Sequence, residues 1–450
     1  MLERVTMGIT RKITIKTILA VVIVAGIGII LAVMMVGRGK PAERNLSCVV
    51  RRASCDAIRN TQYAIRKWGS WPMFRGEQNH SGRAEGDLPD SMVLLWKFKT
   101  SGEVKSSPAI RLAGKPSIDN GLVFVGSADA NIYAIELENG HQVWAYKTGD
   151  VVEAGPCVVE SSVFVGSSDD FLYALDAKTG QLKWKYQTGG KIMGAANWAF
   201  SPDGRGIWIL VGSYDNKLHC VDSANGEVVW TYETGSYVNG SPAVSEGKIA
   251  FGGCDARIYV VSVSDGKMLT QIDSGSYIAG SAALVEGRVY VGNYDNVLIC
   301  GDIATGEVVW KYTGGTSPIF SSPAVGQGDR PKAGSIGPAS GGLDGIKPAF
   351  GGVVVFGCRD KRVHCVNRDN GEVVWTFQTS GEVDSSPAVC GDKVVVGSED
   401  GRLYMIRLSD GKQLWSYEIG QPITSSPAVA GGMVVVGSDD GFVYAFGPGR

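Results

Sequence analysis

The sequence predicts an all-β protein whose main domain is an eight-bladed β-propeller. Three observations predict this fold: glycine is abundant at 62 residues, one segment recurs eight times at a spacing of about 40 residues, and the last copy lacks a strand that is found ahead of the first copy. Abundant glycine with ordinary charge is typical of short strands joined by tight turns. Because repeated units pack only on their neighbours, 450 residues can form a single ring.

Each copy of the repeat contains an apolar strand, a turn with aspartate, a second apolar strand, a turn with glycine, and a strand with tryptophan. The copies begin at Val123, Val163, Ile209, Ile249, Val289, Val354, Val394 and Val434. A further strand precedes each copy, marked by SSPA at Ser106, Ser321, Ser385 and Ser425 and by looser versions at Ala154, Gly194, Gly240 and Gly280. Four strands in each of eight units predict a propeller.

The two ends of the repeat region complement each other. The copy from Val434 ends at Arg450 without its tryptophan strand, and the matching strand, LLWKFKTSG, surrounds Trp96. We expect this strand to complete the last blade, which closes the ring and removes exposed sheet edges. The propeller is therefore expected to comprise residues 92–450.

The N-terminal region has the composition of a membrane anchor. Residues 17–36 carry no charge, and twenty helical residues at ~1.5 Å each span a ~30 Å hydrocarbon core. No small-x-small cleavage site follows. We expect residues 1–16 to be a basic cytoplasmic segment, residues 17–36 a single-pass transmembrane helix, and residues 37–91 a membrane-proximal linker and lead-in.

Charge is divided unevenly along the chain. Residues 1–70 contain 12 Lys and Arg against 3 Asp and Glu, whereas the rest contains 31 against 42. The numbers of basic residues on the two sides of the apolar run are nearly equal, so they do not decide its orientation in the membrane. We place the propeller in the periplasm or outside the cell, because long domains translocate largely regardless of charge. An acidic domain without a basic patch argues against binding of nucleic acid.

Two residue series recur in register. The aspartates are Asp129, Asp169, Asp215, Asp255, Asp295, Asp360, Asp400 and Asp440, and the tryptophans are Trp96, Trp144, Trp184, Trp230, Trp310, Trp375 and Trp415, with Thr270 as the gap. A ring of carboxylates would suit calcium, but an aspartate in a tight turn also accepts backbone N–H groups, and every blade needs that turn. We interpret both series as structural and expect no catalytic, cofactor or metal residues. Four scattered histidines offer little material for a histidine-built site.

Function is then sought where the copies differ. An odd count of nine cysteines precludes complete pairing. We expect Cys157, Cys220, Cys300 and Cys365 to be small buried residues and Cys254 and Cys358, which lie in turns, to be more reactive. Cys48 and Cys55 either pair or line one face of a short helix.

The largest departure is the insertion at 326–352, between the first and second strands of one blade. Smaller insertions at 112–121 and 200–206 occupy the same topological place, so all three should emerge on one face of the ring together with the TG and NG turns. Loops on a rigid scaffold often contain binding residues. A long Gly/Ser-rich loop can also be a connection without a function, and a basic surface often only faces solvent. The candidate interaction residues in and beside the largest insertion are Arg330, Lys332, Lys347, Arg359, Lys361 and Arg362.

Several motifs resemble a known family. ALDAKTGQLKW at Ala174 and CVDSANGEVVW at Cys220 resemble the tryptophan-docking motif of quinoprotein dehydrogenases. The lead-in WPMFRGEQNHSGR at Trp71 and the SSPA and VGS patterns are similar to the PQQ-binding-like propeller repeat proteins, a family that includes the outer-membrane assembly lipoprotein BamB. The resemblance extends from about Trp71 to the C-terminus.

The resemblance implies two alternative functions. Quinoprotein enzymes hold PQQ and calcium over the central axis, use an aspartate base and usually carry a disulfide between adjacent cysteines, whereas this chain has no adjacent cysteines and no aspartate outside the turn series that stands out as a base. BamB-like members use the ring as a noncatalytic platform for other envelope proteins, with a lipidated cysteine where this chain has its apolar segment. We expect a membrane-anchored scaffold that binds envelope proteins and needs no cofactor. The alternative is a dehydrogenase that oxidises an alcohol or sugar with PQQ and calcium.

Overall fold

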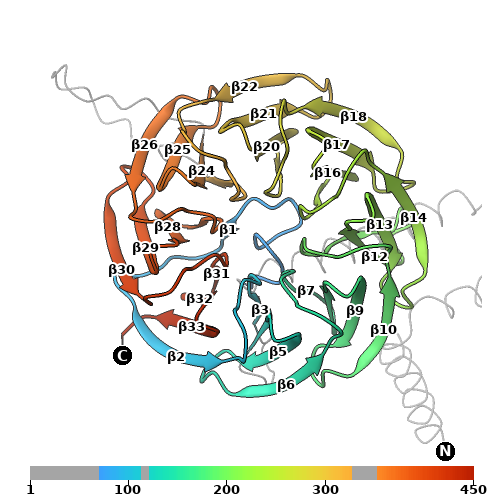
Figure 1. The fold of residues 1–450 in the computed structure, drawn as a ribbon, viewed down its shortest axis with the longest axis horizontal. Coiled ribbons are helices and arrows are strands. Elements are labelled where there is room, and N and C mark those ends of the chain that lie inside the picture. The colour runs from blue at the N-terminus through green and yellow to red at the C-terminus, as the bar shows by residue number, and fades with distance from the viewer. Residues whose placement is uncertain (1–69, 113–120, 327–351, 450) are drawn as a thin grey trace, which may run out of the picture. The chain divides into compact units, whose positions relative to one another are not determined.

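The protein forms a ring of eight antiparallel sheets around a central axis (Figure 1). The computed structural model describes residues 70–112, 121–326 and 352–449. The all-β, eight-bladed architecture predicted from the repeats is confirmed. Within these ranges no helix is long and apolar enough to cross a membrane, and the predicted transmembrane helix at residues 17–36 lies outside them.

The blades follow one another in chain order, each running from the axis to the periphery. Blades 1 to 4 comprise β3 (Ala109–Arg111), β4 (Leu122–Gly126), β5 (Asn131–Glu136), β6 (Gln142–Lys147); β7 (Cys157–Val159), β8 (Ser162–Gly166), β9 (Phe171–Asp176), β10 (Leu182–Gln187); β11 (Asn197–Phe200), β12 (Ile207–Gly212), β13 (Lys217–Asp222), β14 (Val228–Glu233); and β15 (Ala243–Ser245), β16 (Lys248–Gly252), β17 (Arg257–Ser262), β18 (Met268–Asp273). Blades 5 to 8 comprise β19 (Ala283–Val285), β20 (Arg288–Gly292), β21 (Leu298–Asp302), β22 (Val308–Tyr312); β23 (Ala324–Gly326), β24 (Val353–Cys358), β25 (Arg362–Asn367), β26 (Val373–Gln378); β27 (Ala388–Cys390), β28 (Lys393–Gly397), β29 (Arg402–Arg407), β30 (Gln413–Glu418); and β31 (Ala428–Ala430), β32 (Met433–Gly437), β33 (Phe442–Gly447) with β2 (Val93–Lys99).

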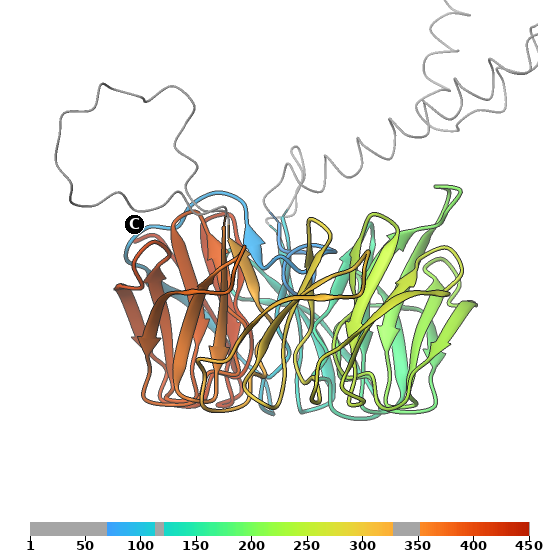
Figure 2. The ribbon, with the colours of Figure 1, turned by 90° about the horizontal axis from the view of Figure 1, so that it is seen from above.

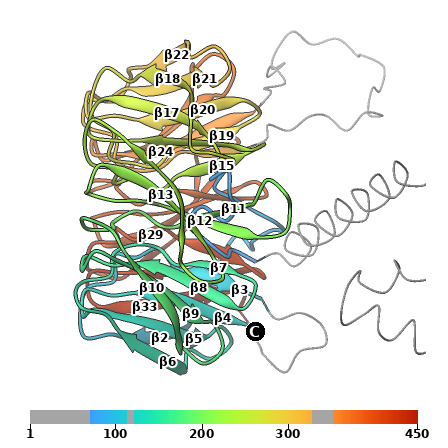
Figure 3. The same ribbon diagram turned by 90° about the vertical axis from the view of Figure 1, so that its right-hand side faces the viewer.

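Burial explains the composition of the strands. The second and third strands of each blade are covered on both faces by neighbouring blades (Figure 3), and all five residues of β4 are buried. The fourth strands alternate exposed and half-buried residues, as in β10 and β14, because only one face packs inward. The near-continuous apolar runs of the sequence therefore form the interior of the ring.

The tryptophan series joins each blade to the next. The indole N–H of Trp144 donates to the carbonyl of Ala177 in the following blade at 3.1 Å, and its ring covers Gly180 of that blade. Six of the seven tryptophans of the series make this inter-blade hydrogen bond. These contacts support the structural interpretation of the tryptophans.

The ring closes as the sequence predicts. β2 pairs antiparallel with β33, with Trp96 opposite Ala445, so the last blade combines the two ends of the repeat region. The indole of Trp96 donates to the carbonyl of Leu137 in blade 1 at 2.8 Å, as the other tryptophans do across their own junctions.

A belt of serines surrounds the axis. The second serine of each SSPA motif accepts a hydrogen bond from the backbone N–H of the equivalent residue in the preceding blade, as Ser426 accepts from Ser386 at 3.0 Å. Six successive junctions from Ala195 round to Ser107 are linked in this way, at 2.8–3.2 Å. The belt explains why this motif recurs, and it fixes the inner rim of the ring.

The lead-in crosses the axis and belongs to the ring. Residues 70–91, which the sequence analysis placed with the linker, lie at one face of the propeller (Figure 2), and β1 (Arg83–Ala84) adds in parallel to β27. Carbonyl oxygens of the lead-in accept hydrogen bonds from the inner strands of six blades, through Ile110, Val158, Val244, Leu284, Val325 and Val389. Each donor is the second residue of its inner strand, whose free edge would otherwise be unpaired.

Candidate functional site

The strand order gives the ring two chemically different faces. The turns between first and second strands and between third and fourth strands lie on one face, which we call the insertion face. The turns that carry the aspartate series and the loops between blades lie on the other, which we call the aspartate face. The three insertions join the first and second strands β3–β4, β11–β12 and β23–β24, and the ends of these strands that they connect lie on the insertion face. Most of 112–121 and 326–352 lies outside the described residues.

The aspartate series forms turns. Asp129 accepts backbone hydrogen bonds from Ser101 and Asn131 and a hydroxyl from Tyr133. Burial opposes ionisation of Asp129, but these hydrogen bonds outweigh it and lower its pKa. Carboxylate bonds of this kind recur at Asp169, Asp215, Asp255, Asp400 and Asp440. These carboxylates are thus engaged by their own turns and by the loops that lead in from the preceding blades, which supports the structural interpretation.

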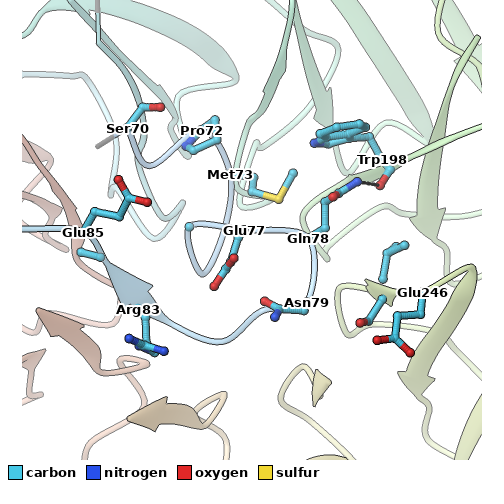
Figure 4. A pocket seen from close by; sticks show the side chains of 14 residues that line it. Ser70, Pro72, Met73, Glu77, Gln78, Asn79, Arg83, Glu85, Trp198 and Glu246 are labelled. Atoms are coloured by element: carbon cyan, nitrogen blue, oxygen red, sulfur yellow. Dashed lines mark hydrogen bonds between the residues drawn. The ribbon is translucent and has the colours of Figure 1, made fainter. Parts of the chain in front are cut away.

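A pocket of about 480 Å³ opens on the insertion face beside the lead-in (Figure 4). Lead-in residues Met73 and Gln78 line it, and Trp198 lies beside Gln78, whose amide donates to the carbonyl of Trp198 at 2.8 Å. The charged residues of the lining are Glu77, Glu85, Glu246 and Arg83. The pocket therefore has a negative balance.

The lead-in carries a buried polar cluster beside this pocket. The guanidinium of Arg75, 1% exposed, donates to the carbonyl of Pro387 at 2.6 Å, and burial lowers its pKa to about 9. Burial, and next the charge of Arg75, lowers the pKa of His80 to about 3. Asn197 donates its side-chain N–H to the carbonyls of Gln78 and Pro242, each at 2.7 Å. This cluster fastens the lead-in to blade 3 through Asn197 and to the loop that enters blade 7 through Arg75.

Aromatic side chains gather on the opposite face, around the loops that enter the inner strands. Tyr237, Tyr277 and Tyr294 are 48%, 55% and 41% exposed. Tyr237 stacks on Tyr214 with ring centroids 4.8 Å apart, and Tyr294 contacts both Tyr277 and Phe320. We call these five residues the aromatic arc. Exposed aromatic side chains in contact with one another are typical of protein-binding surfaces.

Lys105, which pairs with Glu103 at 2.8 Å, lies at one of the corresponding positions of the remaining blades, and carboxylates lie at six of them. We call these the acidic arc: Glu103, Glu153, Glu382, Asp384, Glu399 and Asp439. The carboxylates of Glu382, Asp384 and Glu399 lie within 4.8 Å of one another. Burial and then the charges of Asp384 and Glu382 raise the pKa of Glu399, and burial raises that of Asp439. The acidic arc therefore concentrates negative charge.

Arg359 joins the two arcs. Its guanidinium lies 3.6 Å from the ring centroid of Phe320 and forms hydrogen bonds of 2.6–3.2 Å with the carboxylate of Asp384. The Asp384 contact raises the pKa of Arg359. One of the predicted interaction residues thus lies at the centre of this surface, where its charge is already paired.

Lys361 and Arg362 lie near Arg359 in the chain but make separate contacts. Arg362 donates to the side chain of Gln378 on the neighbouring strand, and the carbonyl of Lys361 accepts from Thr379. All three described candidates belong to the β24–β25 turn on the aspartate face, opposite the face predicted for binding. Arg330, Lys332 and Lys347 lie outside the described residues.

The cysteines are mostly interior residues. Cys157, Cys220, Cys300 and Cys365 are buried, as predicted. Cys358 is also buried, and desolvation raises its thiol pKa to about 12, so the prediction of a reactive thiol is wrong for this residue. Cys254 is partly exposed, and burial raises its pKa as well. Cys48 and Cys55 lie outside the described residues.

The repeats match a known family. The family model described as outer membrane protein assembly factor BamB matches residues 93–202, 195–275, 254–331 and 340–448. The chain belongs to this family. The resemblance inferred from the tryptophan-docking and SSPA motifs is therefore confirmed, and the BamB-family matches cover most of the propeller. A search of curated protein sequences finds no match.

Solved structures share the fold of this BamB-family propeller. BamB from Moraxella catarrhalis superposes with a TM-score of 0.59 at 18% identity, covering 80% of this chain and 98% of that one. A europium-containing methanol dehydrogenase gives 0.62 at 15% identity, covering 84% and 98%. The computationally designed Ika8 protein gives 0.62 at 17% identity, covering 81% and 100%. At these identities the likeness establishes the propeller and leaves the activity to the residues.

The sequence analysis missed two features of this BamB-family chain. The aromatic arc was visible as tyrosines in SYDN, NYDN, GSYV and GSYI, at positions where other copies carry different residues. Asn197 was visible as the polar residue at a position that is alanine in six other SSPA-type motifs and cysteine in one. The rule that departures from the repeat carry function would have found both features.

Proposed function

We propose that this chain is a membrane-anchored, extracytoplasmic scaffold that binds envelope proteins through the aspartate face. Membership of the BamB family supports a role in outer-membrane protein assembly. The observation that carries the proposal is the exposure of Tyr237, Tyr277 and Tyr294, which lie on one face in two groups of contacting aromatic rings. Residues 17–36 supply the anchor and the propeller lies in the periplasm or outside the cell.

The two arcs specify the chemistry of the partner. Tyrosines present large, rigid contact areas at a low cost in conformational entropy. The neighbouring acidic arc attracts basic side chains and disfavours acidic ones. The expected partner is therefore a protein segment that presents apolar and basic residues side by side.

Site-specific photo-crosslinking in membranes tests this proposal. A photoreactive residue at position 277 should give a defined crosslinked product, whereas one at Val228, equally exposed at 51% but on the outer strand of blade 3, should not. Charge reversal by Glu382→Lys with Glu399→Lys should abolish the product at position 277. Equal crosslinking from positions 277 and 228, or a product unaffected by charge reversal, would contradict the proposal.

The dehydrogenase alternative requires a site for PQQ, which carries three carboxylates, together with calcium. The insertion-face pocket fits PQQ poorly, because Glu77, Glu85 and Glu246 outnumber Arg83. Across the ring, the guanidinium of Arg359 is already paired with Asp384. A thermal-shift titration of the full chain with PQQ and calcium separates the alternatives, since a tight ligand raises the melting temperature. We expect no saturable shift.

A further inference from the structure

The β24–β25 turn of blade 6 brings three metal-binding residue types together. One donor atom from each of Cys358, Asp360 and His364 lies within 4.8 Å of the other two. Cys358 is fully buried, and the side chains of His364 and Asp360 are 1% and 2% exposed. Strong ligands removed from water and gathered at one point are the minimum that a bound transition metal requires.

The repeats themselves show that this combination is exceptional. In blades 1, 2, 7 and 8 the position of Cys358 is serine and that of His364 is tyrosine, and the tyrosine hydroxyl donates to the turn aspartate. Blade 6 replaces both hydroxyls, which are poor ligands, with a thiol and an imidazole. The turn needs neither replacement, because the serine and tyrosine versions form the same structure.

Blade 3 provides an internal comparison. It carries His219 beside Asp215, with Nε2 3.0 Å from the carboxylate, but it retains Ser213 where blade 6 has Cys358. The Nδ1 atom of His219 contacts the hydroxyl of Tyr186 at 2.9 Å. Blade 3 therefore repeats the imidazole and carboxylate of blade 6 without the thiol.

The imidazole of blade 6 is oriented for coordination. His364 Nδ1 lies 2.8 Å from the hydroxyl of Tyr312, and Nε2 lies 3.0 Å from the carboxylate of Asp360. Ligands of a tetrahedral ion bound at ~2.0 Å are about 3.3 Å apart, so the imidazole and carboxylate are already close to that spacing. Contacts to the second ring nitrogen are typical of ligating histidines. The thiol of Cys358 lies 3.1 Å from the carbonyl of Ser317, which offers a further oxygen.

We propose that Cys358, Asp360 and His364 bind a divalent transition-metal ion of the zinc type. A mixed thiolate, imidazole and carboxylate set suits zinc better than calcium or magnesium, which take oxygen ligands. Binding releases the thiol proton of Cys358 to solvent. The imidazole proton then resides on Nδ1, where the Tyr312 hydroxyl accepts it. The ion ties the β24–β25 turn to the loop at Ser317 and so braces Arg359, which lies between two of the ligands.

Cobalt titration of the chelator-treated full chain tests the site. Wild type should bind one equivalent of Co²⁺ with a near-ultraviolet thiolate-to-cobalt absorption band, and Zn²⁺ should displace it. Cys358→Ser and His364→Tyr should each abolish the band. These variants install the residues that other blades carry at the same positions, so the fold is expected to persist, as circular dichroism will check.

A gain-of-site variant completes the test. Ser213→Cys should create the same three-ligand set in blade 3 and bind a second equivalent with the same band. The proposal is overturned if wild type binds no more Co²⁺ than Cys358→Ser, which would assign any binding to other cysteines. It is equally overturned if Ser213→Cys binds no second equivalent of Co²⁺, because the same three-ligand geometry would then be insufficient for binding.

Discussion

Val244 donates its backbone N–H to the carbonyl oxygen of Gln78 at 2.6 Å, which joins blade 4 to a segment outside the repeats. Equivalent hydrogen bonds fasten the lead-in to five other inner strands. The lead-in therefore contributes to the stability of the ring and also lines its pocket.

Asn197→Ala should lower the free energy of unfolding by about 2 kcal/mol, because it removes two hydrogen bonds of 2.7 Å, to the carbonyl of Gln78 and to the buried carbonyl of Pro242. Urea denaturation of the purified chain measures the change. Asn225→Ala is the control, since Asn225 is exposed and accepts only from Glu227 in a surface turn. Equal losses in the two variants would show that the buried contacts do not stabilise the lead-in.

Alanine substitutions at two glycines distinguish the cost of a left-handed backbone from the cost of a clash with tryptophan. Gly180 and Gly247 have φ values of +72° and +74°, but a Cβ at Gly180 would lie 2.6 Å from the Trp144 ring, whereas nothing lies within 4 Å at Gly247. Alanine at either position costs about 1 kcal/mol for the left-handed backbone. Gly180→Ala should cost about 1–3 kcal/mol more, from overpacking. Matching denaturation midpoints for the two variants would contradict the close packing at Trp144.

Acid should destabilise the ring through His80. Burial and the charge of Arg75 lower its pKa from 6.5 to about 3, so the unfolded chain binds this proton at higher pH than the folded chain does. The stabilisation is complete above about pH 6.5 and is lost as the pH falls toward 3. Between pH 7.5 and pH 5 the loss from His80 should be about 2 kcal/mol.

Comparison of wild type with His80→Gln isolates this effect. The other titrating groups, among them the buried His219, whose pKa burial also lowers, are common to both proteins and cancel in the difference. Free energies of unfolding measured across this pH range should fall more steeply for wild type. Parallel curves would mean that His80 is not held neutral in the folded protein.

Trp96→Ala should lower the free energy of unfolding by about 3–5 kcal/mol, because it removes a buried indole from the junction between the last and first blades. Leu95→Ala on the same strand is the matched control, since Leu95 is 38% exposed. Thermal and urea unfolding measure both. A larger loss from Leu95→Ala would place the closing contact elsewhere on β2.

The features that the sequence predicted are those that repetition encodes. Trp96 could be assigned to the last blade because seven other junctions define what is missing there. The lead-in at Trp71 offered no such register. It attaches mainly through backbone carbonyls, which leave no pattern of apolar or polar side chains in the sequence.

Only part of the candidate site could be predicted from the sequence. Arg359 could be named as a candidate interaction residue from the sequence, but its pairing with Asp384 depends on the packing of two adjacent blades. The tyrosines of the aromatic arc come from separate blades, and only the ring brings them into contact. The clustering of Cys358 with His364 follows from strand register, which places both side chains beside one turn.

The pairing of β2 with β33 also constrains the order in which the molecule can be made. Translation produces the strand at Val93–Lys99 before any blade, yet its hydrogen-bonding partner at Phe442–Gly447 is synthesised only after the other seven blades. The nascent chain must therefore keep an early, partly apolar strand unpaired throughout elongation. Such long-range pairing slows folding and exposes an aggregation-prone edge. The strand that closes the ring is thus the one that waits longest for its partner during synthesis.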